Sequence, residues 1–448
     1  MCRVSVGCHS AAHGMTMEPL IAAYAVPLLA IWAVYFGLRI RTERRSRAVL
    51  DAAVEAGLNQ PASLHPKIDP ALCVGCGACT RVCPEGDVLG LIKGKAVLIE
   101  PSECIGHGAC RAACPRGAIT LVFGTAQRGI DLPHVGADFQ TNVPGIYIAG
   151  ELGGMGLIRN AIEQGRQAVE TIAHGERARA GNQLDLVVVG AGPAGFSASL
   201  AAMEKKMRFR TIEQESFGGT VAHFPRGKLV MTAPATLPIV GKMSFREVSK
   251  EKLLAFWSKV ARDTGLQVSY GERVEAITKV PAGLLVKTTR GEYATRAVLL
   301  AIGRRGTPRR LEVDGEDLPK VVYRLIDPSQ YRGKTVLVVG GGDSALEAAA
   351  SIAEEEGTQV TLSYRSEAFG RARQKNRERV ATAVKAGRLR VLLKSKVKSI
   401  TPDTVEIEHM GRREQIKNDG VIVCAGGILP TDFLRGIGIE IETKYGTP

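Results

Sequence analysis

The 448-residue sequence predicts an α/β chain with two dinucleotide-binding domains, a small α+β domain and one N-terminal transmembrane helix. Three observations support this prediction. At two places an apolar strand runs into a glycine-rich turn and then a helix, which is typical of a nucleotide-binding α/β unit. Seven cysteines lie between residues 73 and 114, and a charge-free apolar segment lies near the N-terminus. The length suits about three domains.

The first predicted element is a membrane-spanning helix at about residues 19–38, in an N-terminal region of residues 1–47. This apolar stretch has no charge, and at about 1.5 Å per residue it can cross a hydrocarbon layer of roughly 30 Å. Five arginines follow between residues 39 and 47, which predicts a single-pass protein of the plasma (inner) membrane with its other domains in the cytoplasm. A signal peptide is the alternative, but a small-residue cleavage site should then follow.

The cysteine-rich segment predicts a domain of residues 66–122 that binds two iron-sulfur clusters. Each half has the spacing Cys-x2-Cys-x2-Cys-x3-Cys-Pro by which thiolates hold cubane clusters, except that a histidine replaces the second cysteine of the second half. A disulfide or zinc framework is disfavoured, because zinc sites use four ligands and lack the paired Cys-Pro endings. The predicted metal ligands are Cys73, Cys76, Cys79, Cys83, Cys104, His107, Cys110 and Cys114.

This segment resembles the bacterial two-cluster 4Fe-4S ferredoxins, in which the fourth cysteine of each half binds the other cluster. The resemblance implies that Cys114 completes the first cluster and Cys83 the second. His107 leaves two alternatives for the second cluster. The imidazole could supply the fourth bond to a 4Fe-4S cluster, which we favour, or the corner iron is absent and the cluster is 3Fe-4S. A neutral imidazole in place of a thiolate raises the reduction potential.

The first glycine-rich turn lies in LDLVVVGAGPAG, residues 184–195. Gly190, Gly192 and Gly195 occupy the G-x-G-x-x-G positions, where they allow a tight turn and let backbone N–H groups approach a pyrophosphate at a helix N-terminus. Glu213 ends the next predicted strand and can accept hydrogen bonds from ribose hydroxyls. The sequence therefore predicts a dinucleotide site here.

The second glycine-rich turn lies in TVLVVGGGDSALEAAA, residues 335–350, with Gly340, Gly342 and Ala345 at the fingerprint positions. The following strand ends near Arg365, Arg371 is close by, and no acidic residue stands at the ribose position. This pattern favours a 2′-phosphate and therefore NADP, while the nearby Glu367 keeps NAD as the alternative.

Together the two fingerprints resemble the pyridine nucleotide-disulfide oxidoreductase superfamily, and in particular its low-molecular-weight thioredoxin reductase and bacillithiol disulfide reductase branches. The segments VLLAIGRRGTP at 298–308 and VIVCAGGILPTDFL at 421–434 contribute to the resemblance. It implies two Rossmann-like domains, one for FAD and one for NAD(P), and a homodimer is common among such relatives.

The flavin segment that ends such proteins lies here upstream of the first fingerprint. In TNVPGIYIAGELGGMGLIRNAIEQGRQAVETIA, Gly150 and Glu151 match the family's glycine-acid flavin motif, with glutamate replacing aspartate. We therefore expect a circularly permuted flavin domain, which is feasible because domain termini often lie close together. The predicted segments are a linker (48–65), the permuted end of the FAD domain (123–176), its main part (177–304), the NAD(P) domain (305–428) and a return to the FAD domain (429–448).

The cysteines that thiol-disulfide reductases of this superfamily use are missing from this sequence. The redox Cys-x-x-Cys of thioredoxin reductases has no counterpart before the second fingerprint, and Ala194 occupies the position of the cysteine used by the bacillithiol branch. Cys424 lies in an apolar strand, where we expect an inert packing role.

The prediction is an enzyme that passes electrons between NAD(P)H and a one-electron acceptor through FAD and two iron-sulfur clusters. The expected partners are the bilayer and an unidentified redox protein or carrier, and no catalytic acid–base residue is expected. The direction of electron flow follows from potentials and stays open. The alternatives are a thiol-disulfide reductase and a membrane-bound iron-sulfur redox sensor. The net charge of +14 does not indicate nucleic-acid binding, because the chain has no aromatic-basic module.

Overall fold

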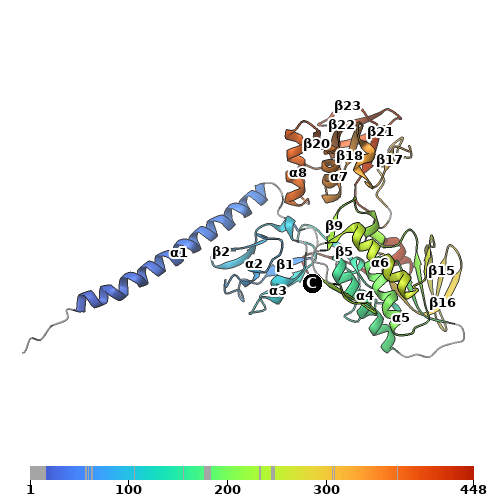
Figure 1. The fold of residues 1–448 in the computed structure, drawn as a ribbon, viewed down its shortest axis with the longest axis horizontal. Helices are drawn as coiled ribbons and strands as arrows, with labels where there is room; N and C mark the ends of the chain where they lie inside the picture. Colours follow the sequence, from blue (N-terminus) through green and yellow to red (C-terminus); the bar gives the residue numbers. More distant parts are fainter. Residues whose placement is uncertain are drawn as a thin grey trace, which may run out of the picture.

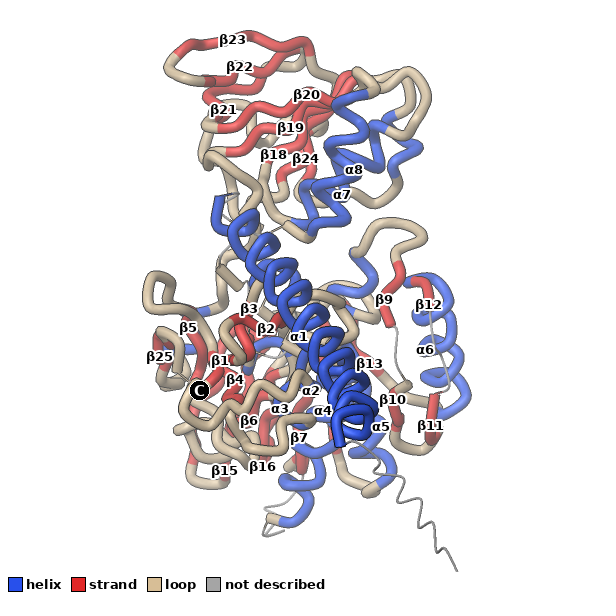
Figure 2. The backbone as a smooth tube through the Cα atoms, turned by 90° about the vertical axis from the view of Figure 1, so that its left-hand side faces the viewer, coloured by secondary structure: helices blue, strands red, loops and turns tan. Residues whose placement is uncertain are grey.

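The computed structural model describes residues 17–55, 58, 60–61, 64–104, 106–154, 156–175, 183–231, 234–243, 248–304, 306, 308–370 and 372–447. A long N-terminal helix projects from the rest of the chain, which consists of a small domain beside the helix and two larger α/β units (Figure 1). A view turned by 90° shows the second α/β unit, with its helices α7 and α8, set apart from the first (Figure 2).

The projecting helix α1 is continuous from Met17 to Glu55. Among the described residues it is the one helix that is long and apolar enough to cross a membrane, judged by length and composition. The sequence predicted a membrane-spanning helix at about 19–38 and a separate short helix from Arg47 in the linker. The structure joins the two into one helix, because no glycine or proline between Leu38 and Glu55 stops it. Its second half instead packs on the small domain, where Ser46 and Ala53 are buried.

The small domain contains two similar halves built around short helices. Strands β1 and β4 pair antiparallel, with His65 opposite Val122, so the two ends of the domain meet. Strands β2 and β3 form a hairpin. Its elements are β1 (His65–Ile68), α2 (Ala78–Arg81), β2 (Leu89–Ile92), β3 (Lys95–Leu98), η1 (Pro101–Glu103), α3 (Ala109–Ala112) and β4 (Ile119–Val122).

The first α/β unit is built on a seven-stranded sheet in the order β13-β8-β7-β16-β15-β14, with β6 also paired to β16. The apolar run of β7 is buried on both faces, as expected for a central parallel strand. The strands are β6 (Ile146–Ile148), β7 (Leu184–Val189), β8 (Phe209–Glu213), β13 (Val268–Tyr270), β14 (Val274–Val280), β15 (Gly283–Thr288) and β16 (Glu292–Leu300).

Segments far apart in the sequence complete this unit. Strand β6 pairs parallel with β16, which places Ile146 opposite Val298. Near the C-terminus, β25 (Ile441–Lys444) pairs antiparallel with β5 (Ile130–Pro133). Helix α4 (Ile158–His174) lies so close to α5 (Pro193–Glu204) that a Cβ on Gly165 would be 2.1 Å from the carbonyl oxygen of Ala194. The segment upstream of the first fingerprint therefore belongs to the same sheet and core.

The other elements of this unit surround the core around Trp257. Helix α6 begins at Ser249, whose hydroxyl accepts a hydrogen bond from the N–H of Lys252, and ends at Gly265, which has a left-handed φ of 73°. The elements are η2 (Glu151–Gly153), η3 (Gly219–His223), β9 (Leu229–Met231), β10 (Ala235–Leu237), β11 (Gly241–Met243), β12 (Val248–Ser249) and α6 (Lys250–Thr264).

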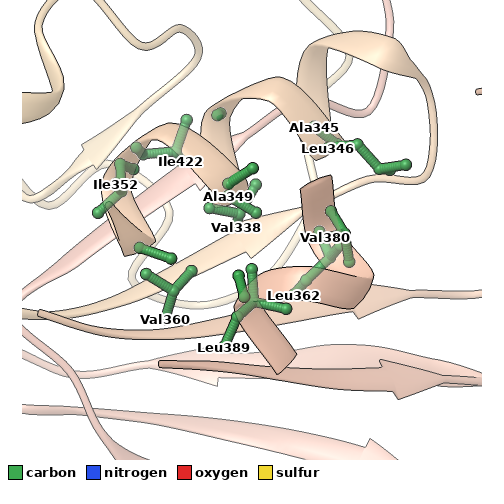
Figure 3. Packing of buried hydrophobic residues seen from close by; sticks show 14 of the residues in the cluster. Val338, Ala345, Leu346, Ala349, Ile352, Val360, Leu362, Val380, Leu389 and Ile422 are labelled. Atoms are coloured by element: carbon green, nitrogen blue, oxygen red, sulfur yellow. The ribbon is translucent and has the colours of Figure 1, made fainter. Parts of the chain in front are cut away.

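The second α/β unit has a five-stranded parallel sheet in the order β17-β24-β18-β19-β20. Aliphatic side chains of α7 and α8 pack on this sheet and form its core (Figure 3). The elements are β17 (Val321–Val322), η4 (Pro328–Tyr331), β18 (Thr335–Val339), α7 (Asp343–Ala353), β19 (Gln359–Tyr364), α8 (Gln374–Lys385), β20 (Leu389–Leu393), β21 (Ser395–Ile400), β22 (Thr404–His409), β23 (Arg412–Lys417) and β24 (Gly420–Val423). The following helix α9 (Thr431–Gly436) returns to the first unit, where Leu434 is buried in the core.

Candidate redox site

The structure brings together the four cysteines that the sequence assigns to the first cluster. Cys73, Cys76, Cys79 and Cys114 line one cavity of about 350 Å³, part of which is open to solvent. Two backbone N–H groups point at their sulfurs, from Ala96 to Cys73 Sγ at 3.4 Å and from Ala118 to Cys114 Sγ at 3.3 Å. Such N–H···S hydrogen bonds stabilise a negatively charged cluster and raise its potential. Four thiols around one cavity are the donor set that a cubane cluster requires.

The remaining cysteines form a second group. Cys104 lies close enough to Cys110 and Cys83 for their charges to affect its ionisation. Burial, the largest cause, raises the pKa of Cys104 to about 11, and it also raises the pKa of Cys79 to about 11. Iron would reverse this preference, because a coordinating thiol is deprotonated by the metal's charge.

The thiols surround a space rather than a point. In the part of the chain that the structure describes, no three His, Cys, Asp or Glu side chains are placed to share a single metal ion. A zinc ion needs four ligands at about 2.0–2.3 Å from one centre. The feature that favours iron-sulfur clusters over zinc is the ligand spacing, with a Cys-Pro ending in each half.

His107 has a buried ring nitrogen that no described group satisfies. Its Nε2 atom is enclosed and makes no hydrogen bond, and a buried unpaired polar atom is unfavourable unless it has a partner such as a metal. Burial lowers the pKa of His107, which favours the neutral imidazole that binds metals. These observations fit His107 as a ligand of the second cluster.

His107 also lies next to the flavin segment. Arg159, in the first turn of α4, is close enough to act electrostatically on the imidazole, as is Glu85 of the small domain. Farther along the chain, Phe123 packs against Gly154, where a Cβ would lie 2.7 Å from the phenyl ring. Gly154 has a φ of 100° and caps η2, which contains the flavin-motif residue Glu151. The second cluster and the flavin motif therefore share a junction.

The first fingerprint has the shape that a dinucleotide pyrophosphate requires. Gly190 has a φ of 104°, and a Cβ at Gly195 would lie 1.8 Å from the carbonyl oxygen of Gly190. The space beside Gly192 is open, with no atom within 3.9 Å of an added Cβ except the Cα of Gly219 at that distance. The open space lies at the N-terminus of α5, where the helix dipole favours an anion.

Two acidic residues were predicted to bind the flavin nucleotide: Glu213 lies near this turn, and Glu151 is part of the flavin motif. Glu213 is buried at the end of β8, and its carboxylate accepts hydrogen bonds from the N–H groups of Ala191 at 2.7 Å and Glu215 at 2.9 Å. Each carboxylate oxygen can accept another hydrogen bond, so a ribose hydroxyl can still bind. Gly150 has a φ of 86°, and its N–H donates to Gln164 at 2.8 Å. Glu151 lies close enough to the half-buried Arg304 to stabilise its charge.

The second fingerprint is formed at the start of α7. Gly340 has a φ of 143°, Gly342 caps the helix, and Ala345 is fully buried. The ring of Tyr364 lies directly on Gly341, 2.3 Å from the position of an added Cβ, and stacks on Phe369 with ring centroids 5.6 Å apart.

The residues proposed to choose between NADP and NAD lie at the end of β19. Arg365 is exposed there, and Arg371 lies outside the described residues. Glu367 is exposed and pairs with Lys394 at 2.5 Å, which draws it away from a free ribose-binding role.

Several residues that shape the site were not predicted from the sequence. Lys95 donates to the carbonyl oxygen of Cys73 at 2.6 Å. Arg304 is half-buried and donates to the carbonyl oxygen of Asp131 at 3.0 Å, and partial burial lowers its pKa. Together with burial, the charge of Arg159 acts on His107 and helps to lower its pKa. Basic residues are spread through the whole chain, so nothing in their spacing marks these three.

Thiol chemistry has little support from the structure. Ala194 is buried beside Gly150, with the two Cβ positions 3.0 Å apart. Cys424 follows β24, packs partly against the core of the second α/β unit and donates its N–H to Val339 at 2.7 Å. It is the only cysteine after residue 114, and a disulfide exchange site needs an accessible thiolate.

Two fingerprint turns on parallel sheets and a cysteine-lined cavity define a class: flavin-dependent, NAD(P)-linked oxidoreductases with an attached 4Fe-4S domain. Comparison with known families agrees. The pyridine nucleotide-disulphide oxidoreductase model matches residues 187–448, and the 4Fe-4S dicluster domain model matches residues 65–115. The chain belongs to the pyridine nucleotide-disulphide oxidoreductase family, which confirms the resemblance predicted from the sequence.

Individual relatives support this membership. A ferredoxin–NADP reductase of Ignicoccus hospitalis is 30% identical over 268 residues, covering 58% of this chain and 83% of the relative. The bacilliredoxin reductase Bdr of Bacillus subtilis is 27% identical over 270 residues, covering 58% and 82%. Among solved structures, the bacillithiol disulfide reductase of Bacillus cereus has a TM-score of 0.52 at 23% identity, covering 58% and 82%, which shows a shared fold.

Proposed function

We propose that this protein is a single-pass membrane oxidoreductase that passes electrons between NAD(P)H and a one-electron acceptor through FAD and two iron-sulfur clusters. NADP is the favoured nucleotide. The anchor is α1, and the other domains lie on the cytoplasmic side because arginines follow the apolar segment. When bound, FAD would accept one hydride, which carries two electrons, and would pass these electrons one at a time to the clusters.

The junction between the small domain and the flavin segment is the observation that carries this proposal. His107, in the second ligand group, is within electrostatic range of Arg159 at the start of α4, and Phe123 packs on Gly154, which follows the flavin motif. The segment connecting the two parts runs only from Cys114 to β5. A short separation between redox centres favours electron transfer, so this packing supports a route from flavin to cluster.

The protein's residues contribute binding and tuning rather than proton transfer. Gly190, Gly192 and Gly195 shape the pyrophosphate site, and the eight predicted ligands divide into two groups. His107, as a neutral ligand, sets the potential of the second cluster above that of an all-thiolate one. Arg304 near Glu151 adds positive charge beside the flavin motif, which stabilises negative charge on a bound group.

The names of several relatives favour a related activity in the reverse direction. The relatives in Ignicoccus hospitalis and Thermus thermophilus are named ferredoxin–NADP reductases. In this chain a 4Fe-4S dicluster domain is fused to the same enzyme fold. We propose that the fused domain takes the place of a separate ferredoxin, so electrons can also flow from a reduced partner to NADP.

The deciding experiment is anaerobic reduction of the full-length protein followed by EPR spectroscopy. NADPH is expected to bleach the flavin and produce signals from two reduced clusters, and NADH to do so more slowly. Flavin and iron-sulfur absorption that neither nucleotide changes would contradict the proposal. Rapid NADPH-dependent reduction of thioredoxin or a low-molecular-weight disulfide would favour the thiol-reductase alternative instead. Retention of the protein in carbonate-washed membranes tests the anchor.

A further inference from the structure

The continuous helix α1 fixes the depth of the small domain relative to a membrane. Arg39 follows Leu38, the last residue of the charge-free stretch. Its guanidinium lies against the β2–β3 turn, with Nη2 2.8 Å from the position of a Cβ on Gly94. One helical turn later, Glu43 accepts a hydrogen bond from the N–H of Lys93. The turn of the hairpin is therefore level with the end of the apolar segment.

Contacts farther along α1 make this placement rigid. Ser46 is buried against Gly90 of β2, where an added Cβ would lie 2.6 Å from the serine oxygen. Arg45 forms an ion pair with Asp87. Because the helix is unbroken between these contacts and the apolar segment, the domain cannot move away from the bilayer by bending a linker.

Bilayer dimensions then place the hairpin turn in the lipid headgroups. The hydrocarbon layer is about 30 Å thick and the whole bilayer about 40–45 Å, which leaves roughly 5–8 Å of headgroups on each side. Arg39 lies one residue, about 1.5 Å, beyond Leu38. Lys93 and Gly94, which contact Arg39 and Glu43, therefore lie within or next to this layer.

The loop of the first cluster packs on the same turn. A Cβ on Gly75 would lie 2.0 Å from the carbonyl oxygen of Gly94, so the two loops touch. Two apolar side chains of this loop are exposed, Leu72 by 43% and Val74 by 63%. Cys76, a ligand of the first cluster, is also exposed. Figure 1 shows α2 and β2 beside α1 on this side of the small domain.

We propose that Leu72, Val74 and Lys93 form a membrane-contact surface, which seats the Cys76 corner of the first cluster against an anionic lipid layer. Two independent features support lipid as the occupant. The exposed apolar side chains suit the headgroup–acyl boundary, and Lys93 with the arginines of α1 complements anionic lipids. The inference rests on the membrane anchoring in the proposed function.

This placement also identifies a class of acceptor for the first cluster. A lipid-soluble quinone resides in the bilayer that the surface contacts. The reaction balances as NADPH + H⁺ + quinone giving NADP⁺ + quinol. The hydride supplies two electrons and leaves its proton to solvent at the flavin, the first cluster delivers the electrons singly near Cys76, and the quinone oxygens take two protons from water. The small domain is thus oriented to transfer electrons from the first cluster to an acceptor in the membrane.

The test uses the full-length holoprotein in nanodiscs that contain phosphatidylglycerol. Hydrogen–deuterium exchange measures whether lipid covers residues 70–76 and 91–95, and an exposed hairpin at residues 409–412 serves as the internal reference. We expect amide exchange at 91–95 to be slower than at the reference by about threefold or more. Equal exchange at the two hairpins would overturn the proposal.

A charge variant adds a functional readout. Leu72→Glu with Lys93→Glu changes the net charge of the surface by −3, and Met410→Glu with Arg412→Glu makes the same change on the distant β22–β23 hairpin. Lys93 and Met410 also share a positive φ, 50° and 51°. We expect the first pair to lower NADPH-driven reduction of a membrane-confined quinone about tenfold and to leave reduction of an uncharged, water-soluble quinone within about twofold. The control pair should change neither rate.

The outcomes separate this inference from the proposed function. Loss of the protein from carbonate-washed membranes would contradict the membrane anchor, and with it both the proposed membrane protein and the membrane-contact surface. Retained anchoring with flavin and clusters that NADPH does not reduce would overturn only the electron route, while the exchange data still test the surface. Normal anchoring and reduction, with an unchanged quinone rate in the Leu72→Glu, Lys93→Glu variant, would overturn the membrane-contact surface alone. EPR signals of both clusters in each variant confirm that the ligands are intact.

Discussion

Replacing Gly195 by alanine tests whether close packing or phosphate approach explains the first fingerprint. A Cβ at this position would lie 1.8 Å from the carbonyl oxygen of Gly190, whereas ordinary contact needs about 3.4 Å. Strand β7 and helix α5 must therefore separate by more than 1 Å. Overpacking of this kind costs about 1–3 kcal/mol, and a domain of this size loses about 2–4 °C of Tm per kcal/mol.

The matched variant is Gly192→Ala. Gly192 has φ −75° and ψ −171°, which any residue adopts, and no atom lies closer than 3.9 Å to its added Cβ. The deflavinated Gly192→Ala protein should therefore unfold at the wild-type temperature. Its methyl group would occupy the space beside the pyrophosphate and displace a phosphate hydrogen bond of about 1.5–3 kcal/mol, so FAD affinity should fall about 10–100-fold.

The two assays are thermal unfolding of deflavinated protein and fluorescence titration with FAD. Gly195→Ala should lower both the Tm and the FAD affinity, whereas Gly192→Ala should lower the affinity alone. Ala345 occupies the equivalent position in the second fingerprint and is buried without disrupting α7, so a requirement for glycine follows from the local distance and not from the motif. A Gly195→Ala protein with wild-type Tm and FAD content would refute the reasoning.

Three further predictions follow from named contacts. His107→Cys adds a negative thiolate and should lower the potential of the second cluster by about 100 mV or more in an EPR-monitored titration; an unchanged potential with an intact cluster would mean that His107 is not a ligand. Cys114→Ala should lose the first cluster and Cys83→Ala the second, each removing about half of the iron, and the reverse assignment would show that the ligands are not interleaved. Glu316→Gln should destabilise the NAD(P) domain at pH 7 by about 1.5–3 kcal/mol, because Glu316 accepts hydrogen bonds from Tyr323 at 2.5 Å and from two N–H groups. Burial acts to raise the pKa of Glu316, but these hydrogen bonds lower it below its ordinary value of 4.5, so the stabilisation is present above that pH and is lost as the pH falls through the lowered pKa. In denaturant titrations, the difference in unfolding free energy between wild type and Glu316→Gln should therefore shrink below pH 4.5. A difference that does not change with pH would contradict this assignment.

The family and the α/β fold were predictable because spacing encodes them. Glycine positions in the two fingerprints and the Cys-Pro endings set backbone geometry locally, and the family comparison confirms the membership they indicated. The strand contacts of the permuted segment also agree with a local signal, since the apolar run at Ile146–Ile148 precedes a glycine-acid turn. Ligand assignment and domain boundaries stay predictions that the comparisons do not test.

Other features depend on tertiary contacts that no short pattern marks. The buried Ser46 lies among arginines, so the sequence gives no sign that this face of α1 packs on β2. The approach of α1 depends on Gly90, whose role appears only when Ser46 is placed against it. Likewise, the ring of Tyr364 on Gly341 brings together two segments that are separated by a whole helix. Long-range packing, rather than local propensity, decides these positions.

The pairing of β5 with β25 sets the order in which the molecule can mature on the ribosome. Asp131 and Thr443, which are joined by a hydrogen bond at 2.7 Å, are 312 residues apart. At about 5–20 residues per second, β5 waits some 15–60 s for its partner strand after it is made. The small domain closes much earlier, because β1 and β4 pair within residues 65–122. Iron-sulfur assembly can therefore begin on a nascent chain, whereas flavin capture has to wait until translation has almost ended.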